Sequence, residues 1–202
     1  RSRLTSLMGI KPEAMRVALY RLRKDGWLQS ERSGRTSAYS LTDWGQAQSA
    51  EATPRIYDEQ PLSDQAWLVL FDPSKPVPDH NIKGTWISSN LLITSNPIPE
   101  KMALFSPILS DQALPDWMSG KICKPEVVQL TQEFHDRLEK LQRTINHVDA
   151  LDCFEISALR ILIVDRWRRI VLKTPDLPVH VFPKGWLGQP CRKGVTDILN
   201  TF

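Results

Sequence analysis

The sequence predicts an α+β protein built from three consecutive parts. A basic helix pattern followed by a hairpin pattern occupies the first part, and short apolar runs bounded by prolines occupy the second. The third part is dominated by apolar residues at helical spacings of three and four. We expect a helix-and-hairpin domain with a connecting helix at residues 1–58, a small α+β domain at 59–124 and a helical domain at 125–202.

The first part contains the clearest helix of the chain. Pro12 suits the first turn, where its missing N–H group is not needed, and Asp25-Gly26 suits the end, where glycine adopts the left-handed conformation. One side of this helix is apolar, and we expect Val17 and Leu22 on it to serve the core. Another side carries larger polar and charged groups, namely Glu13, Arg16, Tyr20 and Arg23.

A hairpin pattern follows this helix. Ser33-Gly34 is a turn signal between two strand-like runs at 29–32 and 35–41. The stretch Leu4–Ile10 resembles the end of a shorter supporting helix, so the order is helix, turn, helix and hairpin. This is the order of a winged helix-turn-helix, whose second helix enters the major groove of DNA.

Charge is concentrated in this first part. Residues 1–39 hold nine Lys or Arg and three Asp or Glu, a net charge of +6, whereas the whole chain carries +3. The remainder is therefore mildly acidic, at −3. A basic end on such a body is typical of a nucleic-acid-binding protein, although a cationic helix face is also a common solvated surface.

The pattern assigns DNA contacts to two groups of residues. The helix would present Lys11, Arg16, Tyr20 and Arg23 to the major groove, where arginine can bond guanine through two hydrogen bonds. The hairpin tip would bring backbone phosphates or the minor groove into contact with Arg32, Ser33, Gly34 and Arg35. Arg21 lies between the apolar and exposed sides, and its role stays open.

Local signals place the later elements. Thr42 is a helix cap, and the connecting helix that follows is expected to be interrupted or restarted at Pro54. A linker at 60–64 follows, and strands are expected at 66–72, 84–88, 91–94 and 102–109. The helical part is expected to contain helices at about 125–148, 155–173 and 190–202, the second of which is apolar nearly all round and should be central.

Composition narrows the class of protein. Three scattered cysteines in no CxxC pair indicate a reducing compartment such as the cytoplasm, and the four histidines make no metal-ligand spacing with them. We find no run of roughly 18 apolar residues, no secretory leader pattern and no catalytic motif, so we expect neither a membrane partner nor an enzyme with a cofactor or metal. Because the chain begins with Arg1 inside a helical pattern, we expect it to be part of a longer protein.

Two stretches resemble the PaaX family of bacterial transcriptional repressors. MRVALYRLRKDGWLQSERSGRTSAYSLTDWG is similar to the family's N-terminal domain, and LIVDRWRRIVLKTPDLPVHVFPKGW is similar to its C-terminal domain. AWLVLFD and GTWIS fit its middle domain, which is similar in fold to the ferredoxin-like CRISPR-associated endoribonucleases. The middle segment is shorter than the family's pattern and lacks much of its first helix.

The resemblance implies a homodimeric repressor that binds an inverted-repeat operator. It implies control of aromatic-acid, phenylacetate-type catabolic genes and release by an aryl-CoA thioester. Such an effector needs cations for its phosphates and an apolar slot, and the C-terminal part offers Arg168, Arg169, Lys173, Lys184 and Trp186. The same residues also fit a helix end and a core, which is the interpretation that we favour.

The alternative function is a metal-dependent nuclease. The related endoribonucleases place an aspartate at the end of their first strand, and Asp72 ends AWLVLFD. An aspartate before Pro73-Ser74 is also a normal turn residue, and no second acid or histidine stands at a spacing that completes a metal site. We therefore favour the DNA-binding function.

Overall fold

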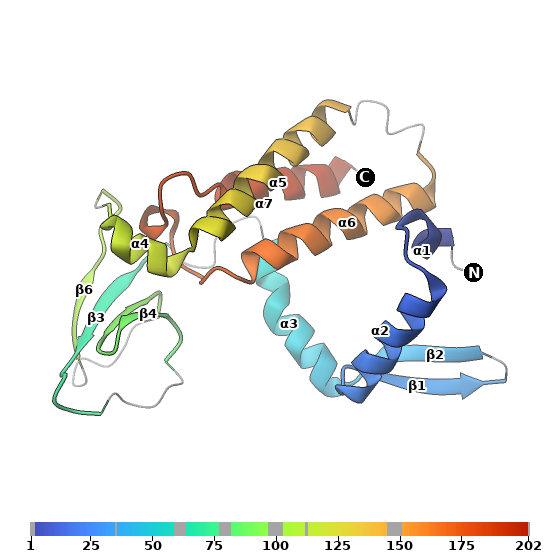
Figure 1. The fold of residues 1–202 in the computed structure, drawn as a ribbon, viewed down its shortest axis with the longest axis horizontal. Coiled ribbons are helices and arrows are strands. Elements are labelled where there is room, and N and C mark those ends of the chain that lie inside the picture. Colours follow the sequence, from blue (N-terminus) through green and yellow to red (C-terminus); the bar gives the residue numbers. More distant parts are fainter. Residues whose placement is uncertain are drawn as a thin grey trace.

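The computed structural model describes residues 3–34, 36–58, 64–76, 82–96, 103–111, 113–144 and 151–201. It is a mixed α+β structure, as the sequence predicts (Figure 1). Its elements are, in chain order, α1 (Arg3–Leu7), α2 (Pro12–Lys24), β1 (Leu28–Ser33), β2 (Thr36–Leu41), α3 (Asp43–Tyr57), β3 (Trp67–Phe71), β4 (Thr85–Ser88), β5 (Leu91–Thr94), β6 (Ala103–Pro107), α4 (Asp116–Ile122), α5 (Pro125–Thr144), α6 (Cys153–Val171), the 3-10 helix η2 (Val179–Val181) and α7 (Gly188–Thr201).

Helix α2 begins and ends where its sequence predicts. Pro12 opens it, and Gly26 follows it with a φ of 76°, a conformation that glycine adopts without strain. The Gly26 N–H donates to the Arg23 carbonyl at 3.2 Å, and the Trp27 N–H donates to the Leu22 carbonyl at 2.8 Å. This pair of bonds satisfies the last carbonyl groups of the helix and turns the chain into β1.

Strands β1 and β2 pair as an antiparallel hairpin. Leu28 pairs with Leu41 at its base, Ser33 pairs with Thr36 at its tip, and Gly34 follows β1 as a turn residue. Gly34 has a φ of 60°, as tight hairpin turns require. The expected second strand began at 35, but β2 begins at Thr36 and Arg35 lies outside the described residues.

The cap of helix α3 confirms the prediction for Thr42. Its Oγ1 accepts the Gly45 N–H at 3.1 Å and donates to the Gly26 carbonyl at 2.5 Å, which ties α3 to the turn after α2. The expected interruption at Pro54 is wrong, because α3 continues to Tyr57. The turn after the proline is hydrogen-bonded, since the Asp58 N–H donates to the Pro54 carbonyl at 3.0 Å. Most of the expected linker lies outside the described residues.

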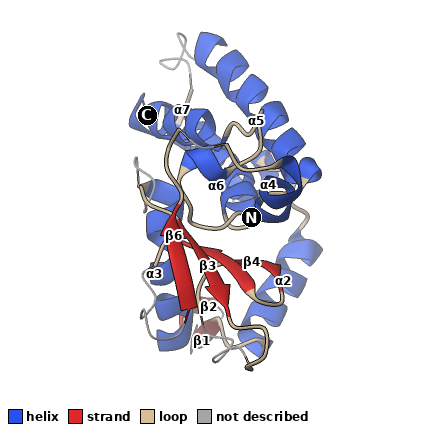
Figure 2. Cartoon of the chain, turned by 90° about the vertical axis from the view of Figure 1, so that its left-hand side faces the viewer, coloured by secondary structure: helices blue, strands red, loops and turns tan. Residues whose placement is uncertain are grey.

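The middle part is a four-stranded antiparallel sheet with the order β4-β5-β3-β6 (Figure 2). In chain order these are the second, third, first and fourth strands of the part. Val69, Phe71 and Leu92 form the core on one face of the sheet. The strand expected at 102–109 corresponds to β6, and Met102 lies outside the described residues. The sequence did not predict α4, which contacts β4.

The C-terminal part packs α5, α6 and α7 around a core that includes Phe134 and Trp167. Their rings are nearly parallel, with centroids 6.4 Å apart. Helix α6 contacts α1, α3, α5 and α7, which confirms its central place. Not every apolar side chain of this helix is buried, because Ile161 and Leu162 are exposed. The expected extension of α5 to Val148 lies outside the described residues.

The core of the sheet continues into the C-terminal part. Leu177, Val181 and Phe182, from the segment between α6 and α7, are buried against the sheet face that holds Ile93 and Ile108. The apolar packing therefore crosses the predicted domain boundary near residue 124.

Candidate nucleic-acid interface

Helix α2 projects its polar side chains into solvent. It contains no buried residue, and Tyr20 is 59% exposed. The guanidinium of Arg16 lies 3.8 Å from the carboxylate of Glu13, and both side chains are largely exposed. Such a surface ion pair contributes little to stability, so Arg16 can exchange Glu13 for another partner at small cost.

Four further cations belong to α2 or its cap. They are exposed, and none has an ion pair with a described residue. They are Lys11, Arg21, Arg23 and Lys24. Arg21, whose role the sequence left open, thus has no acidic partner in the part of the chain that the structure describes.

The hairpin extends beside α2, with β1 in contact with the helix (Figure 1). Arg32 is exposed on β1, where it pairs in register with Ser37. The backbone of Ser33 belongs to β1, and Gly34 begins the turn. The structure therefore brings Arg32 and Gly34 to the hairpin end, whereas Arg35 is not among the described residues.

The apolar side of α2 differs from its prediction. Val17 and Leu22 were expected in the core, but they are 49% and 39% exposed. Among the described elements, β1 makes the main contact with α2, and these side chains do not become buried there. The periodicity groups these apolar residues on one side of the helix, but the expectation that this side is buried in a core is wrong.

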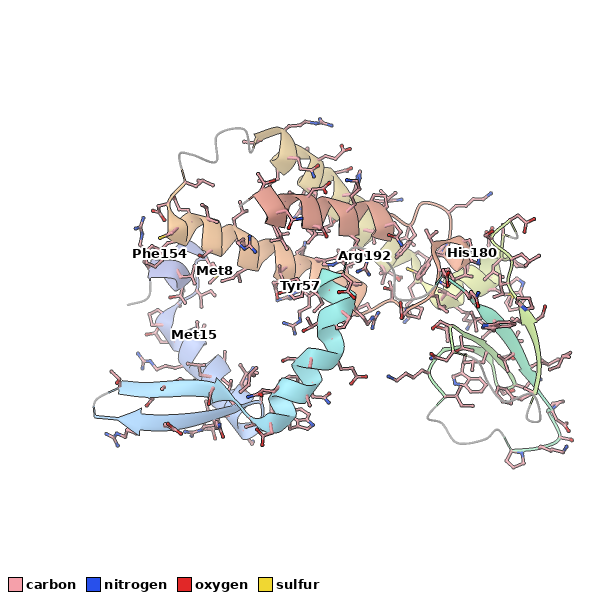
Figure 3. All side chains as sticks on the ribbon, turned by 180° about the vertical axis from the view of Figure 1, so that it is seen from behind. Met8, Met15, Tyr57, Phe154, His180 and Arg192 are labelled. Atoms are coloured by element: carbon pink, nitrogen blue, oxygen red, sulfur yellow. The ribbon has the colours of Figure 1, made fainter. Side chains whose placement is uncertain are left out.

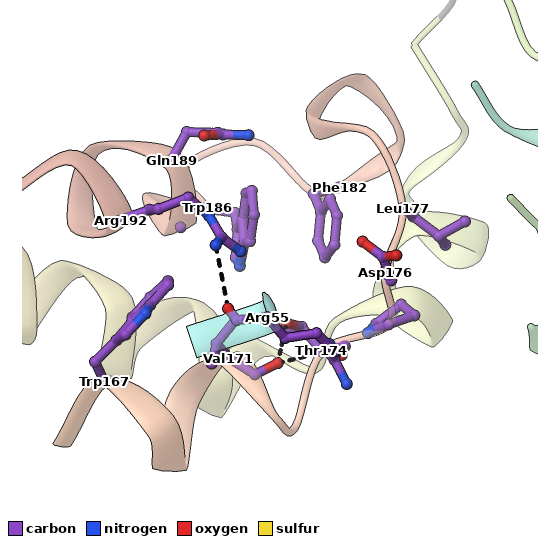
Figure 4. A pocket seen from close by; sticks show the side chains of 12 residues that line it. Arg55, Trp167, Val171, Thr174, Asp176, Leu177, Phe182, Trp186, Gln189 and Arg192 are labelled. Carbon is purple, nitrogen blue, oxygen red and sulfur yellow. Dashed lines mark hydrogen bonds between the residues drawn. The ribbon is translucent and has the colours of Figure 1, made fainter. Parts of the chain in front are cut away.

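Helix α3 connects this surface to the C-terminal part. Its last turn is held by hydrogen bonds to its carbonyl groups (Figure 4). The indole Nε1 of Trp167 donates to the Ile56 carbonyl at 3.0 Å. Arg192 Nη1 donates to the carbonyls of Arg55 at 3.1 Å and Asp58 at 2.7 Å. Together these donors satisfy the carbonyl groups that a helix end leaves free.

Conversely, Arg55 of α3 caps the C-terminal end of α6. Its guanidinium donates to the Val171 carbonyl at 2.7 Å and also to the Thr174 carbonyl, at the C-terminal end of α6. Arg192 lies 5.5 Å from the centre of the Trp167 ring, which adds a cation–π contact. Helices α3 and α6 therefore cap each other at their C-terminal ends.

A second attachment lies at the other end of α6, where α1 contacts it. Arg3 forms an ion pair with Asp152 and lies 5.2 Å from the centre of the Phe154 ring. Asp152 also caps α6, and the N–H of Glu155, followed by that of Phe154 and the charge of Arg3, holds the pKa of its carboxyl below the usual value. The basic part is thus attached at both ends of one helix (Figure 1).

The five candidate effector residues do not meet in one pocket. Arg168 lines an open cavity with Tyr57, whereas Arg169 pairs with Asp165 at 2.9 Å. The Trp186 ring stacks on Phe182 with centroids 3.9 Å apart, beside the capped helix ends (Figure 4). The remaining two, Lys173 and Lys184, are exposed.

The carboxylate of Asp72 serves a turn. It accepts the Ser74 N–H at 2.9 Å and the Ser74 hydroxyl at 2.6 Å, and it lies 3.2 Å from Lys75 Nζ. The bonds from Ser74, with Lys75 adding to them, lower its pKa to about 2. No described group of three or more acidic, His or Cys side chains is arranged to hold a metal, so nothing supports the nuclease alternative.

The sequence did not reveal the residues that hold α3. Trp167 stood out as an apolar residue of the predicted helix and of the stretch that resembles the family, but not as a partner of α3, and Arg55 and Arg192 carried no signal. No helix in the described residues is both long enough and apolar enough to cross a membrane.

Comparisons with known proteins identify relatives. Residues 2–45 match the family model for PaaX-like protein, and residues 124–202 match that for the PaaX-like protein C-terminal domain. The transcriptional repressor PaaX of Escherichia coli strain K12 is 27% identical over 220 residues, which span 92% of this chain and 67% of that protein. A solved structure of an uncharacterized protein from Mycobacterium tuberculosis covers 98% of this chain and 85% of its own, with 18% identity and a TM-score of 0.48.

Proposed function

Because the chain belongs to the PaaX-like family, we propose that it is a DNA-binding transcriptional repressor and not an enzyme. The observation that carries the proposal is α2, a helix with no buried residue and exposed arginines, followed directly by a hairpin. Helix, turn, helix and hairpin is the order of a winged helix-turn-helix. A relative that is named a transcriptional repressor and spans most of the chain supports the same function.

The domain assignment is part of this proposal. Residues 1–58 form the winged helix-turn-helix with its connecting helix, 59–124 a ferredoxin-like domain and 125–202 a helical domain. The order of the middle sheet supports the second assignment, because second, third, first and fourth strands in an antiparallel sheet is the ferredoxin-like order.

Base reading falls to α2 in this proposal. Arg16, Tyr20 and Arg23, with Lys11 at the helix start, enter the major groove. Their exposure supports this, and the weak Arg16–Glu13 pair leaves the arginine available for a guanine edge. Arg21 and Lys24 add positive charge that attracts the phosphates.

Backbone positioning falls to the hairpin. Arg32, Ser33, Gly34 and Arg35 contact phosphates or the minor groove, where cations are attracted without a requirement for particular bases. The exposure of Arg32 near the hairpin turn supports this role.

The repressor is proposed to act as a homodimer on an inverted repeat. A two-fold dimer would place its two α2 helices about one turn of DNA apart, so the half-sites would be spaced by roughly 10 base pairs. Sedimentation of the protein with and without its site tests the dimer, and a footprint that lacks two-fold symmetry would contradict it.

The most specific part of the proposal concerns the regulated genes and the effector. Control of phenylacetate-type catabolic genes and release by an aryl-CoA thioester follow from the family resemblance. Phenylacetyl-CoA should then raise the melting temperature and weaken operator binding, whereas CoA alone should not. An acyl-CoA series that changes neither quantity would remove the effector from the proposal.

The function itself is tested by selecting bound fragments from genomic DNA and measuring their affinity by fluorescence anisotropy. We expect a common inverted repeat and a dissociation constant that rises steeply with salt, with a slope of roughly 0.9 per phosphate neutralised. Lys24→Gln should reduce the slope, whereas Lys140→Gln, on the distant helix α5, should not. Selection that yields no shared sequence would contradict the proposal.

A further inference from the structure

An open cavity lies where the end of α3 meets α6 and α7. Its volume is about 380 Å³, which falls within the roughly 300–1,000 Å³ of small-molecule sites. It is lined by Tyr57, Arg160, Ile161, Val164, Asp165, Arg168 and Leu199. Tyr57 is the last residue of α3, so the cavity is shared between the connecting helix and the C-terminal part (Figure 3).

The polar lining of this cavity favours an anion. The side chain of Arg168 is exposed and forms no hydrogen bond or ion pair with the described residues. The carboxylate of Asp165 already accepts a hydrogen bond from Arg169 at 2.9 Å, which offsets its charge. Arg160 donates from Nη1 to the Leu199 carbonyl at 2.7 Å and remains charged. A ligand therefore meets two guanidinium groups and one carboxylate that is already paired.

The rest of the lining is apolar. Ile161 is 43% exposed and Tyr57 is 52% exposed, and Val164 and Leu199 lie beside them. Apolar side chains that stay in solvent on a helix whose other side is packed in a core are a candidate surface for a ligand's apolar body. The phenol of Tyr57 forms no hydrogen bond with the described residues, so its ring offers a face without a competing polar contact.

We propose that this cavity binds a small organic anion with an aromatic body. The guanidinium of Arg168 binds the anionic group through charge-assisted hydrogen bonds, and Tyr57 with Ile161 contacts the ring. The site itself does not require the protein to bind DNA. Its use as an effector site rests on the proposed function. Tyr57 follows Ile56, whose carbonyl accepts the Trp167 indole N–H, so a ligand at Tyr57 would lie beside the attachment of α3.

The test is isothermal titration calorimetry with a pair of probes that share one ring and differ in whether the polar group is charged. 1-Naphthylacetate carries a carboxylate, and 1-naphthylacetamide has the same ring without the charge. We expect the acid to bind at least about 10-fold more tightly than the amide, as a charge-assisted bond predicts. Arg168→Gln should reduce the acid to the affinity of the amide, while Tyr57→Ala should weaken both probes.

The matched control is Arg166→Gln. Arg166 is exposed on the same helix but does not line the cavity, so its variant should bind both probes as the wild type does. Arg168 has no described partner, so its replacement should leave the melting temperature unchanged. Equal affinity for acid and amide, or a preference that survives Arg168→Gln, overturns the proposal.

DNA affinity is measured separately on the same proteins. Selective binding of the acid without DNA binding would leave the cavity site standing and remove the proposed function. DNA binding without selective acid binding would remove the cavity site and leave the proposed function standing.

Discussion

Helix α2 of the N-terminal part and helix α6 of the C-terminal part differ in how many of their residues are buried. Helix α2 buries no residue, whereas α6 buries Ala158, Ile163, Trp167, Ile170 and Val171. The helix with the exposed arginines depends on attachment to other elements for its position. The helix at the centre of the C-terminal part supplies that attachment at both of its ends. The exposed cationic surface and the stable framework are therefore carried by different residues.

The attachments themselves are chiefly polar. Arg192, Trp167 and Arg55 donate to carbonyl groups at helix ends, and the one buried apolar residue that α3 adds to the C-terminal core is Ile56. Carbonyl groups at a helix end have no partner within the helix, so these bonds fix the direction of α3 without a large interface.

The largest expected effect is at Trp167. Its side chain is 1% exposed, so Trp167→Ala should lower the free energy of unfolding by about 3–5 kcal/mol and also remove the bond to the Ile56 carbonyl. Trp44→Ala is the control, because Trp44 is half exposed in the N-terminal part. Urea denaturation followed by circular dichroism measures both, and equal losses would contradict the contrast between the regions.

The second-largest effect on stability is expected at Gly45, with Gly120 as its control. A Cβ at Gly45 would lie 2.6 Å from the Trp27 carbonyl oxygen, so Gly45→Ala should cost about 1–3 kcal/mol of stability. A Cβ at Gly120 in α4 would meet nothing within 4 Å, so Gly120→Ala should stabilise by up to about 1 kcal/mol. Thermal unfolding gives the sign of each change, and the same sign for both would be inconsistent with the packing described.

A smaller effect is expected at Thr42. Its hydroxyl caps α3, so Thr42→Ala should cost about 1 kcal/mol. Thr53→Ala serves as the control, because the Thr53 hydroxyl bonds only within its own exposed turn and should matter by less than about 0.5 kcal/mol. If the two variants have the same urea midpoint, the cap does not hold the connection between α2 and α3.

The smallest effect is a dependence on pH from Asp72. Its folded pKa of about 2 lies below the usual 3.8, so its stabilisation is present above pH 3.8 and is lost as the pH falls toward 2. Asp72→Asn should therefore lose a small stabilisation at neutral pH and converge with the wild type as the pH approaches 2, which flattens the acid dependence of unfolding in that window. Unfolding curves from pH 5 to pH 2 test this, and an identical profile for the variant would exclude the turn as a source.

Local features of the fold could be predicted because local residues cause them. Pro12 and Gly26 fix the ends of α2, Thr42 fixes the start of α3, and apolar spacing identifies α5 and α6. Helix α4 was missed because its single short turn pattern carries little periodicity. The continuation of α3 beyond Pro54 was missed because proline removes one hydrogen bond but need not end a helix.

The rest depends on contacts between distant positions. The bond from Trp167 to the Ile56 carbonyl joins residues 111 positions apart, and that from Arg192 to the Arg55 carbonyl joins residues 137 apart. A long arginine side chain can reach many carbonyl groups, so its sequence position does not identify its partner. Likewise, the periodicity of α2 shows which residues share a side of the helix but not whether another element covers that side. The exposure of Val17 and Leu22 could therefore not be predicted.

The central claim is that the arginines of α2 serve DNA binding and not the fold. The most direct measurement compares Arg16→Ala/Arg23→Ala with the wild type, for both affinity to the selected DNA site and stability to urea. We expect an affinity loss of about 5- to 150-fold per arginine, since each bidentate base contact contributes about 1–3 kcal/mol, with an unchanged urea midpoint. Unchanged DNA affinity in a folded double variant would contradict it.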